Sequence, residues 1–259
     1  LLCGRSGCGK TTLTRFINGL IPQFFTGEMS GSVLLDGENL TDIPMYRIAE
    51  KVGSVFQNPR TQFFNVDTDS EIAFGMENDA FPQDVLTARV KKTAKELNIE
   101  NLLGRSIFAL SGGEKQKIAF ASVYAMNPDV YLLDEPSSNL DIKAIEELKE
   151  CIRLVKSQGK TVIVAEHRLY YLVEVADRII YLENGRIAGD FTPKQFRDLP
   201  DVIRQGMGLR TIDLQSEKPV CTDCCDKKAM LELKNVTLSY QKQPVLQNIS
   251  FKAALGDVI

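Results

Sequence analysis

The sequence predicts an α/β fold with a parallel core sheet. Two apolar runs, residues 130–133 and 161–165, are continuous rather than alternating, as is typical of strands buried on both faces. Residues 142–155 between them carry apolar side chains at helical spacing. A glycine-rich turn, residues 4–9, joins the end of a further apolar strand to a helix. Strands that alternate with helices form a parallel sheet, because each parallel connection needs a crossover.

Local signals predict the other elements of the first 200 residues. Asp141 begins the helix that follows residues 130–134, and Gly159 ends it. Asn184-Gly185 is typical of a type I′ hairpin turn and predicts a hairpin around it. Three further segments are a helix over 10–20 that ends at Asn18-Gly19, a strand over 31–37 that ends in an Asp-Gly turn, and a strand over 52–57.

The chain divides into three expected parts. Residues 1–199 form the α/β part, in which residues 67–127 are mostly helical and make a helical subdomain. Residues 200–229 have no clear periodicity and are expected to be a linker. Residues 230–259 follow with one alternating strand over 231–240 and a second and third strand over 245–259.

Composition excludes several classes of protein. The 259 residues are 44% hydrophobic and 25% charged, which rules out disordered, collagen-like and disulfide-scaffold chains. Lysine and arginine number 31 against 34 acidic residues, so no basic surplus favours nucleic acid. No apolar run approaches the roughly 18–20 residues of a membrane span. The chain begins without Met and within a strand, so we interpret it as a fragment of an intracellular protein with six reduced cysteines.

The turn at residues 4–11, Gly-Arg-Ser-Gly-Cys-Gly-Lys-Thr, fits the phosphate-binding pattern G-x-x-x-x-G-K-[ST]. Glycines let successive backbone N–H groups point into one concavity, and the following helix N-terminus adds its dipole. Lys10 is expected to reach the β- and γ-phosphates and the Thr11 hydroxyl to bind Mg²⁺. The residues expected to contact the nucleotide here are Gly4, Ser6, Gly7, Cys8, Gly9, Lys10, Thr11 and Thr12.

Cys8 has two interpretations within this loop. It is either a tolerated variable position or a thiol made reactive by the helix N-terminus. Alkylation of Cys8 that ATP does not slow would count against the second interpretation.

An acidic pair, Asp134-Glu135, ends the apolar strand over 130–133. A carboxylate at this strand end, opposite a phosphate-binding loop, can support Mg²⁺, and the next carboxylate can polarise an attacking water. We therefore expect Asp134 to contribute to the metal site and Glu135 to be catalytic.

Between the loop and the acidic pair lies Leu110-Ser-Gly-Gly-Glu114, followed directly by a helix. Here the sequence resembles the ATP-binding cassette (ABC) ATPases, whose signature is Leu-Ser-Gly-Gly-Gln. The resemblance covers residues 1–200 and implies a P-loop NTPase cassette that hydrolyses ATP with Mg²⁺. It implies that Ser111, Gly112 and Gly113 contact ATP held by the opposite cassette.

Other family motifs follow in order. Gln57 matches the glutamine that senses Mg²⁺ and the transmembrane partner, so it belongs to the expected nucleotide and metal set. Residues 137–141 resemble the D-loop, which ends at Asp141. His167, the one histidine of the chain, stands after the strand over 161–165 where the family has its switch histidine. The resemblance therefore implies a catalytic contact of His167 with the γ-phosphate and with Glu135.

Several strings resemble the energy-coupling factor (ECF) branch, which imports vitamins and transition-metal ions. They are residues 55–59 with 62–64, residues 71–78, and Ala165-Glu-His-Arg-Leu169. The alternative is a soluble tandem ABC ATPase that acts in translation or on nucleic acid, because Glu114 also occurs there. Such proteins usually have Ser-His-Asp-Arg at the switch and a long charged linker, which argues against them here.

Residues 230–259 resemble the antiparallel strands with which a cassette begins, and which this chain lacks before its phosphate-binding loop. Tyr240 stands in the place of the aromatic residue that stacks on adenine. We interpret the chain as the first of two tandem cassettes followed by the start of the second. The terminal strands either complete their own cassette by permutation or pair with a neighbouring molecule by strand swapping.

The cluster Cys221, Cys224 and Cys225 has the Cys-x-x-Cys spacing of zinc sites. A closed site needs four ligands, however, and no histidine or further cysteine lies nearby. Linker thiols are therefore the favoured interpretation.

The resemblance implies an ATP-hydrolysing subunit of an ECF-type importer, peripheral at the cytoplasmic face of the membrane. Its expected partners are a second ABC cassette, a transmembrane coupling subunit and a substrate-binding membrane subunit, with no nucleic acid. The sequence does not name the transported substrate.

Overall fold

The computed structural model describes residues 1–25, 27–214, 229–240 and 243–257. They belong to two compact units, Leu1–Leu214 and Gln215–Ile259. Cys221, Cys224 and Cys225 lie outside the described residues, so the structure does not test their role. Within the described ranges there is no helix long and apolar enough to cross a membrane, and no group of three or more potential metal-binding His, Cys, Asp or Glu side chains.

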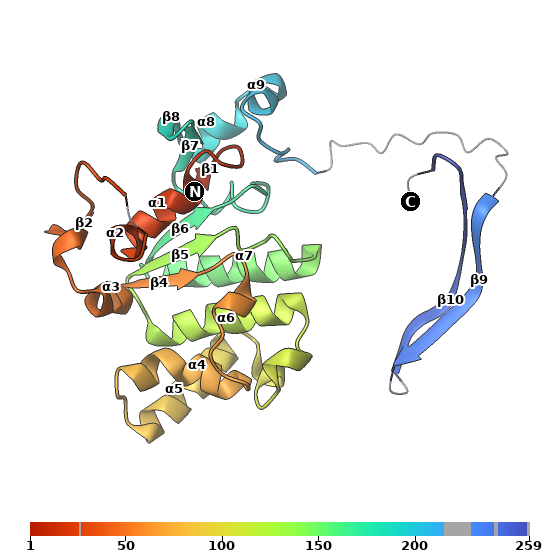
Figure 1. Ribbon diagram of the computed structural model, residues 1–259, viewed down its shortest axis with the longest axis horizontal. Coiled ribbons are helices and arrows are strands. Elements are labelled where there is room, and N and C mark those ends of the chain that lie inside the picture. The colour runs from red at the N-terminus through yellow and green to blue at the C-terminus, as the bar shows by residue number, and fades with distance from the viewer. Residues whose placement is uncertain (26, 215–228, 241–242, 258–259) are drawn as a thin grey trace. The chain divides into compact units, whose positions relative to one another are not determined.

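The larger unit contains a six-stranded sheet in the order β4-β5-β6-β1-β7-β8 (Figure 1). All neighbouring strands pair in parallel except β7 and β8, which form the hairpin around Asn184-Gly185. This confirms the predicted α/β fold with a parallel core sheet. The strands are β1 (Leu2–Cys3), β4 (Val52–Val55), β5 (Val130–Asp134), β6 (Thr161–Ala165), β7 (Ile179–Glu183) and β8 (Arg186–Phe191).

Helices cover both faces of this sheet, and successive side chains of β5 point to the two faces in turn. Tyr131 and Leu133 pack in one apolar cluster with α6 and α7, whereas Leu132 packs on the other face with residues of α1 and α3. The helices that belong to this part of the unit are α1 (Lys10–Ile17), α2 (Leu20–Gln23), α3 (Met45–Lys51), α6 (Gly112–Met126) and α7 (Ile142–Ser157).

Two expected elements are shorter than predicted. The helix expected over 10–20 ends at Ile17, because Gly19 takes a left-handed φ of 75° before α2 begins. The strand expected over 31–37 is the first half of a small hairpin, β2 (Leu34–Leu35) and β3 (Glu38–Asn39), whose turn is Asp36-Gly37.

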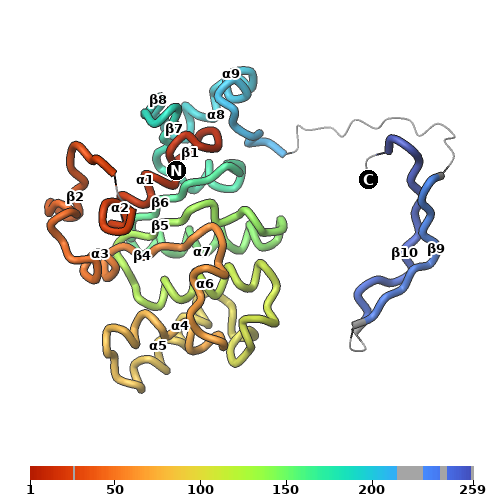
Figure 2. The backbone as a smooth tube through the Cα atoms, viewed as in Figure 1, coloured from red at the N-terminus to blue at the C-terminus, as the bar shows by residue number. Residues whose placement is uncertain are grey.

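Residues 67–127 are mostly helical, as the pattern predicted. They contain α4 (Thr68–Asn78), α5 (Gln83–Glu96) and α6, and α4 and α5 lie next to each other in the backbone trace (Figure 2). The Asp67 side chain begins α4 by accepting a hydrogen bond from the Ser70 backbone at 2.9 Å. Short 3₁₀ turns complete the connections of the unit: η1 (Leu40–Asp42), η2 (Pro59–Thr61), η3 (Glu100–Leu102) and η4 (Ile107–Ala109).

The first compact unit continues past residue 200, where the sequence had predicted the start of a linker. The chain after α8 (Pro193–Arg197) forms another helix, α9 (Asp201–Gly206), and the first compact unit extends to Leu214. The buried Arg204 side chain donates to the carbonyl oxygens of Phe196 and Leu199, at 3.3 and 2.5 Å. Such tertiary contacts have no periodic pattern, which is why the sequence alone did not reveal this ordered segment.

Phe196 anchors this segment, so we predict that Phe196→Ala lowers the free energy of unfolding by about 3–5 kcal/mol. Its side chain is fully buried and packs edge-on against Phe191 with ring centroids 5.8 Å apart. Chemical denaturation measures the effect, and Leu214→Ala, at a half-exposed position, is the control. A loss below about 1 kcal/mol for Phe196→Ala would contradict the assignment of this segment to the core.

The second unit contains an antiparallel pair, β9 (Ala229–Tyr240) and β10 (Gln243–Ala254). The predicted antiparallel strands at the C-terminus are therefore confirmed. The expected third strand is wrong in its described part, because Leu255 and Gly256 form a turn in which the Asp257 backbone donates to Ala254. The side chain of Tyr240 lies outside the described residues, so its expected stacking on adenine stays a prediction.

Candidate functional site

The glycine-rich turn connects β1 to α1 and has the backbone that its glycines predict. Gly4, Gly7 and Gly9 all have positive φ, at 148°, 78° and 105°. A Cβ atom on Gly4 would lie 2.3 Å from the Leu182 carbonyl oxygen, so a larger residue cannot fit there without movement. The loop is therefore held closely against β7.

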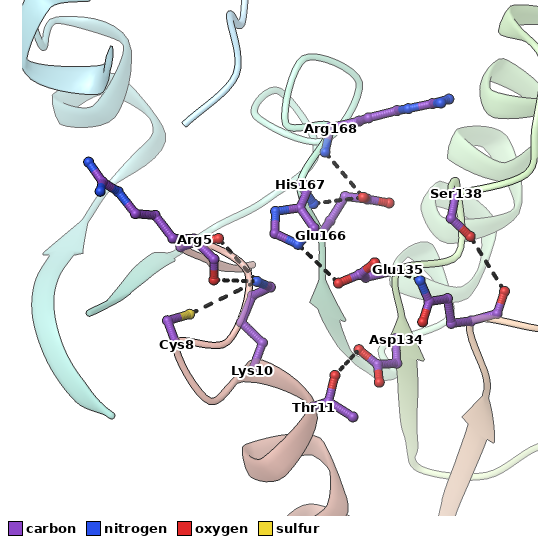
Figure 3. Close-up of polar contacts among 12 residues, drawn as sticks. Arg5, Cys8, Lys10, Thr11, Asp134, Glu135, Ser138, Glu166, His167 and Arg168 are labelled. Atoms are coloured by element: carbon purple, nitrogen blue, oxygen red, sulfur yellow. Dashed lines mark hydrogen bonds and ion pairs between the residues drawn. The ribbon is translucent and has the colours of Figure 1, made fainter. Parts of the chain in front are cut away.

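Lys10 is the first residue of α1 and is buried. Its ammonium group donates to the carbonyl oxygens of Gly4 and Arg5, at 3.0 and 3.2 Å, and so lies across the concavity of the loop (Figure 3). The cation is thus already held at the place where the motif requires a positive charge for phosphate.

The N-terminus of α1 differs from those of α6 and α7. Ser111 and Asp141 cap the latter two helices with their side chains, whereas the N-cap residue of α1 is Gly9, which has no side chain to cap it. Uncapped N–H groups and the helix dipole favour an anion at this position. The loop and helix together therefore fit a phosphate group.

Thr11 and Asp134 come from α1 and the end of β5, and their side chains point toward each other (Figure 3). The Thr11 hydroxyl donates to an Asp134 carboxylate oxygen at 3.4 Å. Burial, with a further contribution from the neighbouring Glu135 charge, raises the pKa of Asp134. A hydroxyl and a half-buried carboxylate beside a second carboxylate are hard oxygen donors of the kind that suits Mg²⁺. Thr11, Asp134 and Gln57 line one cavity of about 360 Å³.

Glu135 lies in the centre of the expected catalytic residues. One carboxylate oxygen accepts a hydrogen bond from the Gln57 amide at 2.9 Å, and the other lies 3.0 Å from Nε2 of His167. Its backbone has a positive φ of 45° and donates to the Ala165 carbonyl at 2.8 Å. A non-glycine residue in this conformation is strained, and such strain is common at functional sites.

The signature residues form a separate site. Ser111, Gly112, Gly113 and Asp141 line a different cavity, of about 350 Å³, that contains none of the residues around Glu135. Ser111 and Glu114 form a capping box at the start of α6, and the Glu114 carboxylate also pairs with Arg105 at 2.8 Å. The hydrogen bond from the Ser111 backbone lowers the pKa of Glu114. The structure therefore brings Lys10, Thr11, Gln57, Asp134, Glu135 and His167 into one region and leaves the signature residues apart.

Comparison with known proteins decides the family. The model of the ABC transporter family matches residues 1–138, which is more than half of the chain. The chain belongs to this family. It is similar to an ABC transporter ATP-binding protein of Treponema denticola, with 51% identity over the whole chain and 54% of that protein. It is also similar to an ABC transporter ATP-binding protein of Pyrococcus horikoshii, with 39% identity over 83% of this chain and 74% of that protein.

Two solved structures have the same cassette fold. The cbiO1 protein of Clostridium perfringens, part of the ABC transporter complex cbiONQ, matches with a TM-score of 0.69 and 30% identity over 79% of this chain and 80% of that one. The ATP-binding cassette MJ0796, a dimer bound to ADP and phosphate, matches with a TM-score of 0.64 and 25% identity over 74% and 84%. The chain is thus a P-loop NTPase cassette of the ABC ATPases, a family that binds ATP with Mg²⁺ and hydrolyses it. It spans about half the length of the Treponema protein.

Other expected nucleotide contacts differ in exposure. Ser6, Gly7 and Thr12 are exposed and therefore accessible to a ligand, whereas Cys8 is buried in the cassette with its sulfur 3.9 Å from the Lys10 ammonium. Burial of the thiol disfavours the interpretation of Cys8 as a reactive group. The roles of all these residues toward ATP stay predictions.

The sequence analysis missed two polar residues of the cassette, Glu166 and Arg168, which flank His167. It used them only as part of a string that resembles the ECF branch. The structure shows both side chains bonded to the loop after β5. A charged residue directly after a continuous apolar strand was the available signal.

Proposed function

We propose that this cassette hydrolyses ATP with Glu135 as the residue that orients and activates the attacking water. The observation that carries the proposal is the position of Glu135 between Gln57 and His167, beside Asp134. Lys10 and the uncapped amides of α1 hold the phosphates, and His167 contacts the γ-phosphate. Thr11 and Asp134 would hold Mg²⁺, and the chemistry that this ion would supply is neutralisation of phosphate charge.

A complete site requires a second cassette in this proposal. Ser111, Gly112 and Gly113 begin α6 and line a cavity apart from Lys10, so one chain alone does not place them on its own nucleotide. Their helix N-terminus can bind the γ-phosphate of ATP on a facing cassette, with Asp141 beside it. The dimeric state of the similar cassette MJ0796 supports this arrangement.

We further propose that residues 230–259 begin a second, tandem cassette. Two observations support this organisation: the β9–β10 pair is antiparallel, and the chain spans only 54% of its Treponema relative. Tyr240 would then stack on the adenine of the second site. In this chain the strands would complete the first cassette by permutation or would swap with a neighbouring molecule.

A membrane partner is the last part of the proposal. A groove of about 340 Å³ lies between β4 and the helices α4 and α6, close to the segment that carries Gln57. Phe56 and the strongly exposed Phe64 line it, and Phe64 stacks on Phe74 with ring centroids 4.8 Å apart. An exposed aromatic groove of this kind suits an apolar helix of another protein.

The likeness of this chain to cbiO1 favours an ECF-type importer of a vitamin or metal ion, with the cassette peripheral at the cytoplasmic face of the membrane. The partners in that case are a transmembrane coupling subunit and a substrate-binding membrane subunit.

Co-purification of the full-length protein from gently solubilised membranes tests the transport proposal. We predict that a small polytopic membrane protein accompanies it, and that Phe64→Asp reduces its recovery several-fold because a charge enters the apolar groove. Phe108→Asp, at a similarly exposed phenylalanine outside the groove, is the matched control. Recovery of ribosomal proteins instead would favour the soluble translation-associated class.

A further inference from the structure

The loop after β6 is joined to the loop after β5 by a buried carboxylate. The Glu166 side chain is only 2% exposed. One of its oxygens accepts from the Ser137 backbone N–H at 3.2 Å and from the Tyr171 hydroxyl at 3.0 Å. The other accepts from the backbone N–H groups of His167 and Arg168, at 2.7 and 3.1 Å. A buried carboxyl group whose oxygens accept four hydrogen bonds has its polar atoms satisfied, and these bonds hold the backbone on either side of it.

Arg168 makes the reverse connection between the same two loops. Its guanidinium donates to the carbonyl oxygens of Ser137 and Leu140, at 3.2 and 3.1 Å. The N–H and C=O of Ser137 are therefore both bound by the residues that flank His167. Figure 3 shows both side chains extending away from the His167 ring.

These contacts form a closed ring of linked residues that includes Glu135 and His167. Ser137 follows Glu135 by two residues, and its backbone N–H donates to Glu166. His167 follows Glu166 directly, and its Nε2 atom lies 3.0 Å from the Glu135 carboxylate. Ser137 is fully buried, so its surroundings restrict its movement. The separation of the His167 ring and the Glu135 carboxylate thus depends on the Glu166 contacts.

The four groups around Glu166 all donate hydrogen bonds to its carboxylate oxygens. Burial and the adjacent carboxylate raise the pKa of Tyr171 well above its usual value, so its hydroxyl stays protonated and donates. A glutamine at position 166 offers one acceptor oxygen and one NH₂ group. The NH₂ would face N–H or O–H donors, because all four groups around Glu166 donate.

We propose that Glu166 and Arg168 are positioning residues that clamp His167 against Glu135. The inference rests on the proposed roles of Glu135 and His167, and it assigns to the flanking pair no contact with ATP. Loss of the clamp displaces the histidine relative to the carboxylate, and a displacement near 1 Å in such a site costs on the order of 100-fold in rate.

Steady-state ATP hydrolysis by four proteins tests the clamp: the wild type, Glu166→Gln, His167→Ala and the double variant. We expect Glu166→Gln to reduce kcat by about 10–100-fold and to leave KM for ATP within about twofold, since Lys10 and its loop are untouched. In the His167→Ala background Glu166→Gln should cause almost no further loss, because both changes remove the same contribution.

Two further variants complete the design. Tyr170→Phe is the control, because this neighbouring hydroxyl is not among the described hydrogen-bond donors to Glu166, and it should keep the wild-type kcat. Arg168→Gln breaks the reverse connection and should show the same kinetic pattern as Glu166→Gln. If thermal unfolding shows that Glu166→Gln does not fold, Arg168→Gln replaces it in the same set of kinetic measurements.

The outcomes separate the clamp from the proposed function. An equal loss of kcat from Glu166→Gln with and without His167, or a kcat unchanged by both clamp variants, overturns the clamp alone. A His167→Ala variant as active as the wild type overturns the proposed role of His167, and the clamp with it.

Discussion

Glu135→Gln is expected to reduce ATP turnover by about 100–10,000-fold, the usual contribution of a general base. Glutamine has almost the same shape as glutamate but cannot accept a proton from water. Lys10 and the N-terminus of α1 remain intact, so the affinity for ATP should change by less than about threefold. Because ATP then stays bound, the variant should accumulate as a closed dimer in the presence of ATP. Phosphate release and light scattering measure the two effects.

Glu174→Gln is the matched control for this variant. It makes the same chemical change at an exposed position and should leave turnover unchanged. A Glu135→Gln protein that retains more than about a third of the wild-type turnover would refute the assigned role of Glu135.

Lys10→Met is expected to weaken ATP binding about 100-fold or more. The ammonium would make charge-assisted hydrogen bonds to phosphate, worth about 1.5–3 kcal/mol each, and methionine makes none. A 100-fold increase in the dissociation constant corresponds to a loss of about 2.8 kcal/mol of binding free energy. Titration with a fluorescent ATP analogue measures the change.

The control for Lys10→Met is Lys194→Met, at an exposed lysine far along the chain. The thermal unfolding midpoint of Lys10→Met must also be recorded, because the variant leaves the carbonyl oxygens of Gly4 and Arg5 without their present donor. Wild-type affinity in a folded Lys10→Met protein would show that the nucleotide does not bind at this loop.

The sequence predicted best what depends on local backbone requirements. The glycines of residues 4–9, the apolar run that becomes β5 and the Asp141 cap of α7 are short-range patterns, and all three have the predicted conformation. Placing Asp134, Glu135 and His167 together needed only the rule that neighbouring parallel strands end at the same edge of a sheet.

What the sequence did not reveal depends on contacts between distant residues. The buried Arg204 makes α9 part of the first unit, yet the segment has no apolar periodicity. The bonds of Glu166 and Arg168 to Ser137 join loops about 30 residues apart in the chain, and neither local charge nor spacing indicates such pairing. The expected third strand lacked a neighbouring strand within the described part of its unit with which to pair.

The central claim is that ATP held at Lys10 and Glu135 is hydrolysed only when the signature of a second cassette closes over it. Mixing two variants of the chain, Lys10→Met and Ser111→Arg, tests it most directly through the rate of phosphate release. Each variant alone should be inactive. The mixture should recover about a quarter of the wild-type rate, since half of the dimers are mixed and each of these holds one intact site. A mixture no more active than the two variants measured separately would contradict the claim.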